Sequence, residues 1–234
     1  MTKVGFIGIY DKLDMILNVA KVLQLVGKNV LIVDATNIQK ARYTVPSISP
    51  TFKYVTNFEE FDVAVGFESL QEVYNYLGLE EQEEQESTYD ILLVDCDSTD
   101  SMKKFKIAEA DNKYFVTAFD NYSLKRGLEI FNRSEENIEL RKILYSKNML
   151  KEENDYLNFL AAGLDITWKT EIIYFPIENG DLTEIMENQR VAKIKFKKLS
   201  QSYKDSIEYL ATEIARDCNQ NRIRKVMKNL ERGV

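Results

Sequence analysis

Three charged residues, Lys12, Asp34 and Asp95, each stand just after a short apolar run of this sequence. Ligands of an open α/β sheet bind outside the carboxyl ends of its strands, so we expect these residues to line one crevice. A lysine in the first turn of a helix can meet an anion there. Strand-terminal carboxylates can serve chemistry, or they can hydrogen-bond nearby turns. The segments that would form the crevice are 7–13, 34–37 and 95–98.

The sequence excludes several kinds of catalytic site. It contains no histidine, which rules out Ser-His-Asp and Cys-His catalysis and His-ligated metals. Cys96 and Cys218 lie far apart without a CxxC partner, so neither a disulfide framework nor a zinc site is expected. Asp95 and Asp97 share one face of their strand, but two acids alone do not indicate acid/base catalysis. We therefore predict no metal site.

A strand–helix–strand unit opens the chain. Residues 4–9 are an apolar run punctuated by glycines, which is typical of a buried parallel strand. Apolar residues then recur at helical spacing over 14–26, and Gly27 supplies a stop signal. A second apolar run, 28–34, closes on a carboxylate. Such a βαβ unit implies a right-handed crossover and a parallel sheet.

Strands and helices alternate along the rest of the chain. This alternation predicts a doubly wound α/β fold, with a mainly parallel sheet and helices on both faces. No repeat, Gly/Ser linker or second-domain boundary is found, so residues 1–234 are expected to form a single domain. The predicted strands are 89–95, 113–118, 140–145 and 171–175, and the predicted helices are 66–79, 123–131 and a C-terminal region from residue 199.

The order of these segments resembles the ParA/MinD family of deviant P-loop ATPases (SIMIBI class). That family opens with a strand, the loop K-G-G-x-G-K-[ST] and a helix carrying N-L-A. Here Asn18-Val19-Ala20 matches the helix, which places residues 7–13 on the loop. The resemblance spans nearly the whole chain and implies a P-loop NTPase-like fold. Segments similar to the later family motifs are 27–34, 89–97 and 176–211.

The loop itself departs from the family pattern. A P-loop binds phosphate because its glycines turn backbone N–H groups toward the ligand, its lysine supplies charge and its Ser/Thr holds Mg²⁺. Of these residues only Gly8 and Lys12 remain, while Asp11 replaces a glycine and Leu13 replaces the hydroxyl residue. At about 4 Å and an effective dielectric of about 20, two like charges repel by about 4 kcal/mol. The resemblance therefore implies a vestigial phosphate loop that has lost ordinary Mg·ATP hydrolysis.

Alternative roles stay open for the retained residues. By the resemblance, Asp34 and Asp95 match the family's catalytic-site and Mg²⁺-linked carboxylates, and Gly8 and Lys12 would bind the nucleotide. Each also has a structural explanation: Gly8 allows a tight turn, Lys12 can be a solvated first-turn lysine, and the two acids can be relics. We expect no cofactor, with ATP as the alternative.

Two charged segments lie outside these motifs. The acidic run within residues 79–89 is expected to be a solvated loop or a frayed helix end. Residues 219–232 form a basic amphipathic helix with apolar residues at i, i+3, i+4 and i+7 from Ile223. Relatives resembling MinD end in a helix that lies on the membrane surface. Because this helix is short and lacks Trp and Phe on its apolar face, we expect it to pack on the body or on a partner, with peripheral membrane contact as the alternative.

Composition bears on location and partners. The net charge is −7, which argues against a general DNA-coating protein because phosphate binding needs a clustered excess of Lys and Arg. The chain begins with a strand pattern instead of a signal peptide, and no stretch reaches the ~18 apolar residues of a membrane span. A cytoplasmic protein is expected.

The first functional hypothesis is a non-catalytic pseudo-ATPase. It would keep the ParA/MinD-like scaffold, alone or as a homodimer, and position or recruit a larger assembly through protein–protein contacts. Divergent family members of this kind resemble the TadZ/CpaE-type proteins that localise pilus or secretion machinery. The alternatives are an active ATPase of the partition or septum-positioning type, which would use Lys12, and a nucleotide sensor that binds without turnover.

Overall fold

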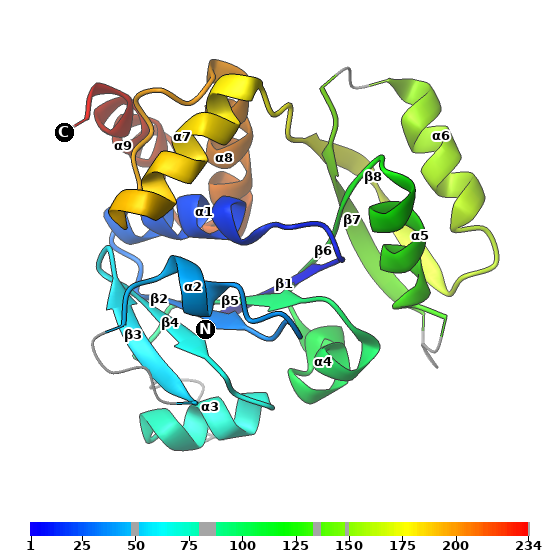
Figure 1. Ribbon diagram of the computed structural model, residues 1–234, viewed down its shortest axis with the longest axis horizontal. Coiled ribbons are helices and arrows are strands. Elements are labelled where there is room, and N and C mark those ends of the chain that lie inside the picture. Colours follow the sequence, from blue (N-terminus) through cyan, green and yellow to red (C-terminus); the bar gives the residue numbers. More distant parts are fainter. Residues whose placement is uncertain (48–51, 80–87, 133–136, 148–149, 234) are drawn as a thin grey trace.

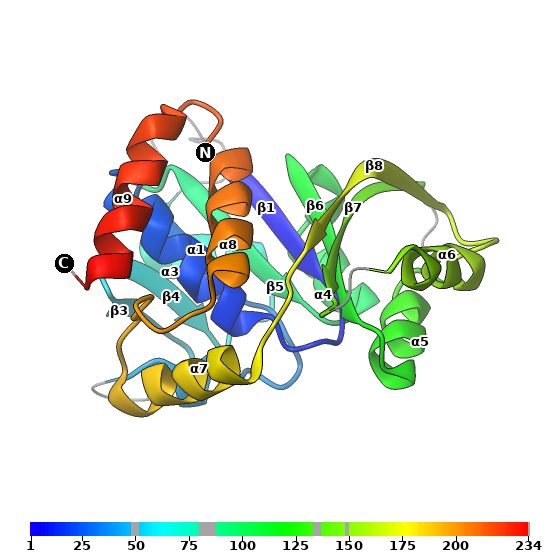
Figure 2. The same ribbon diagram turned by 90° about the horizontal axis from the view of Figure 1, so that it is seen from above.

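One β-sheet organises the chain. The computed structural model describes residues 1–47, 52–79, 88–132, 137–147 and 150–233. Within them the sheet has eight strands in the order β3-β4-β2-β5-β1-β6-β7-β8, and helices cover both of its faces (Figures 1 and 2). The strands are β1 (Thr2–Ile7), β2 (Val30–Asp34), β3 (Tyr54–Phe58), β4 (Phe61–Val65), β5 (Ile91–Cys96), β6 (Asn112–Ala118), β7 (Ile138–Tyr145) and β8 (Ile166–Tyr174). The helices are α1 (Leu13–Leu25), α2 (Ala41–Thr44), α3 (Leu70–Leu77), α4 (Thr99–Lys104), α5 (Asn121–Glu129), α6 (Lys151–Leu160), α7 (Asn179–Val191), α8 (Gln201–Ile214) and α9 (Gln220–Arg232).

Parallel pairing runs through the centre of the sheet. Strands β2, β5, β1 and β6 are hydrogen-bonded neighbours, and every residue of β2 and β5 is buried. Their apolar runs are therefore central strands covered on both faces. The register pairs Asp34 with Asp95 and Ile7 with Cys96, which brings the ends of β2, β5 and β1 together. The predicted doubly wound, mainly parallel α/β fold is confirmed.

Each face of the sheet has its own apolar core. Helices α1, α7, α8 and α9 pack on one face, and α3, α4, α5 and α6 pack on the other (Figure 1). Helix α1 lies between the sheet and the pair α8 and α9. This position holds the start of α1, and the loop before it, against the carboxyl ends of the central strands.

The C-terminal helix packs on the body of the protein. In α9, Ile223 and Met227 are buried at 0% and 2% exposure, and they join the core formed with α1 and α8. The apolar face of this helix is therefore used inside the fold. Among the described residues, no helix has both the length and the apolar character that a membrane crossing requires.

Other elements were not predicted from the sequence. Strands β3 and β4 form an antiparallel hairpin at one edge of the sheet, joined at Glu59 and Glu60, which both have positive φ (51° and 69°). Hairpin turns with two positive φ angles usually carry Asn-Gly, so the Glu-Glu pair gave no turn signal.

Helix α3 begins at Leu70, later than predicted, because Ser69 caps it by accepting a hydrogen bond from the Glu72 N–H. Most of the acidic run expected over 79–89 lies outside the described residues.

Candidate phosphate-loop site

Gly8 follows the end of β1 at a point where two strands approach closely. Its φ is +148°, and a Cβ at this position would lie 2.1 Å from the backbone oxygen of Val116 in β6. The Gly8 N–H donates to the Cys96 carbonyl at 3.0 Å. Only glycine fits here, and the packing of β1 against its neighbours is sufficient to require it.

The Lys12 side chain turns back toward the strand ends. The residue is 3% exposed and stands immediately before α1. Its Nζ donates to the Gly8 carbonyl oxygen at 2.7 Å and lies 2.6 Å from Asp95 Oδ1. Lys12 is therefore not a solvated surface lysine, because its ammonium is enclosed and held by two oxygens of the protein.

Asp95 is the counter-ion of this lysine. It is 4% exposed, and burial raises its pKa to about 6, against the stabilising charge of Lys12. The neighbouring Asp34 carboxylate raises the pKa further. The pairing offsets part of the cost of burying the two charges, since burial still outweighs the attraction of Lys12 in the raised Asp95 pKa.

The Asp34 carboxylate is engaged by the turn that leads into α2. Asp34 Oδ1 accepts hydrogen bonds from the Thr36 N–H (3.1 Å) and hydroxyl (2.5 Å), and Oδ2 accepts one from the Ala41 N–H (2.8 Å). Asp97 is held in a similar way, because Asn37 donates to it from both its backbone N–H and its side-chain amide. These contacts fix the segment between β2 and α2 over the strand ends.

A second ion pair lies at the mouth of the loop. The Asp11 carboxylate pairs with the Lys40 ammonium, which also lies 3.5 Å from Asp14 Oδ2. The negative charge that replaces a loop glycine is thus neutralised by a lysine from the segment before α2. The sequence did not predict Lys40 as a site residue, because the stretch between β2 and β3 carries neither helical nor strand periodicity.

The remaining loop residues pack inward. Leu13 is 1% exposed and belongs to the core. The Tyr10 ring lies 4.6 Å from that of Tyr145, which stacks on Phe175 at 5.4 Å. Burial raises the pKa of Tyr145, so this phenol stays neutral. Within the described residues, no three Cys, Asp or Glu side chains come together in a group that could hold a metal ion.

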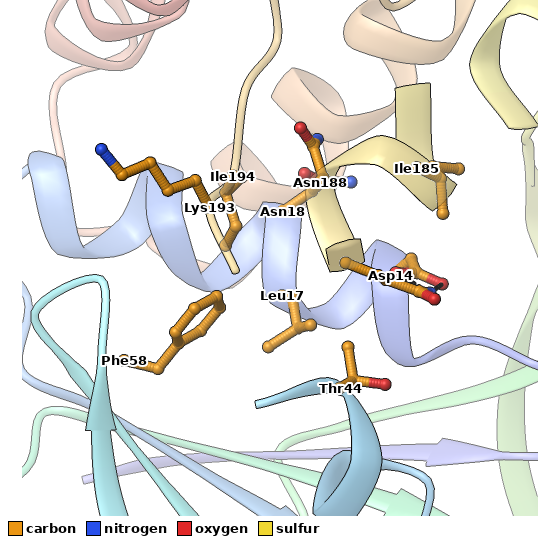
Figure 3. Close-up of a pocket in the computed structure, with 10 residues that line it drawn as sticks. Asp14, Leu17, Asn18, Thr44, Phe58, Ile185, Asn188, Lys193 and Ile194 are labelled. Carbon is orange, nitrogen blue, oxygen red and sulfur yellow. Dashed lines mark hydrogen bonds between the residues drawn. The ribbon is translucent and has the colours of Figure 1, made fainter. Parts of the chain in front are cut away.

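A small cavity lies beside the loop between α1, α2, β3 and α7 (Figure 3). Its volume is about 20 Å³, and Asn188 Oδ1 is buried without a hydrogen bond from any described residue. Gln189 donates to both carboxylate oxygens of Asp14 at 2.9 Å across this space. A cavity of this size fits one water molecule and not a nucleotide. Its lining residues are Asp14, Leu17, Asn18, Thr44, Phe58, Ile185, Asn188, Gln189, Lys193 and Ile194.

Comparison with known proteins gives structural matches only. No protein-family model and no curated protein matches the chain. A ParA family ATPase from Chlorobium tepidum TLS superposes with a TM-score of 0.53 at 14% identity, covering 98% of this chain and 97% of that one. The MinC:MinD cell division protein complex of Aquifex aeolicus gives 0.57 at 17% identity, covering 90% and 96%. A plasmid partition protein of Borrelia burgdorferi B31, solved with AMPPNP, gives 0.54 at 10% identity, covering 97% and 98%.

These similarities extend along nearly the full length of each chain, while the sequence identities stay low. The chain therefore has the ParA/MinD-like P-loop fold.

Proposed function

We propose that this chain is a cytoplasmic ParA/MinD-like scaffold that does not turn over ATP, and that it positions or recruits a larger assembly through protein–protein contacts. The observation that supports this most directly is the enclosure of Lys12. Its ammonium is bound to the Gly8 carbonyl and to Asp95, at 3% exposure of the residue. The positive charge needed for phosphate binding is already used within the protein.

Two energetic barriers oppose nucleotide binding at this loop. A phosphate that drew Lys12 away would leave Asp95 buried and unpaired, and breaking a buried pair in this way costs about 3–5 kcal/mol. Asp11 adds repulsion of about 4 kcal/mol when its charge is not screened, and Lys40 reduces this only while it stays paired. Breaking the buried pair alone corresponds to roughly a thousandfold in affinity, and the pairing of Asp11 with Lys40 makes the second effect smaller.

The structural neighbours support a protein partner, and they also make ATP binding the alternative function to test. One neighbour was solved as a complex of MinC with MinD, which supports a protein partner for a chain of this fold. Another was solved with AMPPNP, so ATP binding, with or without hydrolysis, is the alternative that the experiment must address. The chain would act alone or as a homodimer.

The direct test is equilibrium binding and turnover of labelled ATP with Mg²⁺ by the purified protein. We expect neither saturable binding nor phosphate release. Saturable binding without turnover would instead identify a nucleotide sensor. Turnover that disappears in Lys12→Ala would identify an ATPase and would overturn the proposal.

A variant that restores the family residues of the loop tests whether the substitutions at Asp11 and Leu13 are the cause of absent ATP binding. Asp11→Gly with Leu13→Thr restores the glycine and the hydroxyl of the loop, and we expect it to bind ATP at least about tenfold more tightly than the wild type. The matched control is Asp155→Gly with Leu157→Thr in α6, which changes an exposed aspartate and a buried leucine at the same spacing. Equal binding by the two variants would show that the loop residues do not limit affinity.

A further inference from the structure

Six exposed basic side chains gather at one end of the molecule, which we call the basic end. Three come from the segment between α7 and α8 and three from α9, and the two elements lie side by side in both views (Figures 1 and 2). The chain as a whole carries a net charge of −7, so this surface is opposite in sign to the protein. The six residues are Lys193, Lys195, Lys197, Lys225, Lys228 and Arg232.

The segment between α7 and α8 presents its lysines in a row. Phe196 is 1% exposed and Ile194 packs against the same core, so the alternate residues Lys193, Lys195 and Lys197 face outward. The Asn188 side chain donates to the Lys195 carbonyl at 2.9 Å and holds the segment in place. Figure 3 shows the Lys193 ammonium directed away from the neighbouring cavity.

Helix α9 adds the second half of the surface. Its apolar residues Ile223 and Met227 are buried in the core, which turns Lys225, Lys228 and Arg232 outward. Because its apolar face is occupied, α9 has nothing to insert into a lipid bilayer. The outward face of this helix therefore presents mainly charged side chains to a partner.

The cations of the basic end form no close ion pair within the described part of the chain, although Lys195 interacts electrostatically with Glu187 at longer range. None of the six lies within ion-pair distance of a carboxylate there, whereas Lys12, Lys40 and Arg141 are each paired. Like charges held close together repel, and an anionic partner relieves this repulsion.

We propose that the basic end docks an acidic segment of a partner protein. Asp or Glu side chains of such a segment can meet the exposed lysines at 193, 195 and 197, because opposite charges attract. Three further cations on α9 provide a second line of contact. This inference deepens the proposed scaffold function by naming a class of partner, and it does not depend on the state of the phosphate loop.

The test uses a fluorescent glutamate decapeptide and anisotropy at about 50 mM NaCl, where surface charges are weakly screened. We expect saturable binding to the wild type that weakens at about 300 mM NaCl. The variant Lys193→Glu/Lys195→Glu/Lys197→Glu should bind at least about tenfold more weakly. The matched control, Lys125→Glu/Lys147→Glu/Lys151→Glu, changes the net charge equally at exposed positions of α5, the segment after β7 and α6. It should stay within about twofold of the wild type.

Three results would overturn the inference. The first is no binding of the decapeptide at low salt, and the second is an equal loss in the control variant. The third is tighter binding, at the same salt, of a short DNA duplex or of phosphatidylserine vesicles, which would assign the surface to nucleic acid or to a membrane. None of these results would restore ATP binding, so failure here is distinguishable from failure of the pseudo-ATPase proposal.

Discussion

At the scale of single residues, the site is defined by charges that neutralise one another. Lys12 and Asp95 form a buried pair, and Asp11 and Lys40 form a half-exposed one. In a phosphate loop the lysine contacts the phosphates of the ligand, whereas in this structure Lys12 contacts the strand-end carboxylate of Asp95. Substitutions of these charged residues are therefore expected to change the free energy of unfolding.

Lys12→Met should destabilise the protein by about 3–5 kcal/mol, because it leaves Asp95 buried without a counter-ion. The measurement is chemical unfolding, with Lys125→Met on the exposed face of α5 as the control, expected within about 0.5 kcal/mol of the wild type. Adding Asp95→Asn to Lys12→Met should recover part of the loss, since the pair then disappears together. If Lys12→Met behaved like the control, the lysine would be solvated and the proposed enclosure would be wrong.

The titration of Asp95 should also make the stability of the protein depend on pH, in a direction that its raised pKa determines. Its folded-state pKa of about 6 lies above the ordinary value of 3.8, so its contribution to stability is complete below about pH 4 and is lost as the pH rises through about 6. The loss amounts to at most about 3 kcal/mol. Unfolding of the wild type and Asp95→Asn across this window should therefore differ in slope, with the wild type falling more steeply. Parallel curves would contradict the raised pKa.

At the scale of elements, α1 and α9 show how packing decides function. Helix α1 fixes the loop against the strand ends, and α9 covers α1 with its apolar face. A basic amphipathic helix is compatible with a membrane surface, but a helix whose apolar face is buried stabilises the fold instead.

Ile223→Ala should therefore cost about 2–4 kcal/mol of unfolding free energy, as for other large-to-small changes in a core. Asn229→Ala, an exposed position of the same helix, is the control and should change stability by less than about 0.5 kcal/mol. Equal, small effects at both positions would mean that α9 is loosely attached and free to bind elsewhere.

At the scale of the whole molecule, the sheet order brings the ends of β2, β5 and β1 together. The basic end adjoins the region of the phosphate loop, because Lys193 lines the same small cavity as Asp14. A nucleotide can change the oligomeric state only if it binds the two states differently.

The molar mass in light scattering should accordingly be the same with and without Mg·ATP. This holds whether the protein is a monomer or a constitutive dimer, because the expected cause is absence of binding. The Asp11→Gly/Leu13→Thr variant serves as the comparison. A shift of the wild type from monomer to dimer on addition of Mg·ATP would support the sensor or the ATPase.

Much of this protein is determined locally by its sequence. The apolar runs that end at Asp34 and Asp95, and the helical period after Lys12, predict the central parallel strands and α1, because burial on both faces of a sheet leaves a short-range pattern. The substitutions at Asp11 and Leu13 are equally visible, since the chemistry of a phosphate loop depends on residue types at fixed spacing.

Only the tertiary structure decided how the charges are used. Lys12 meets Asp95, and Asp11 meets Lys40, across long stretches of chain. The Lys193–Lys197 row joins α9 in the same way, from a segment with no periodic signal of its own. Electrostatic pairing depends on distance in space and on burial, and neither is encoded in local spacing. The sequence therefore determined which charges this protein carries, and the fold determined which of them neutralise one another and which remain open to a partner.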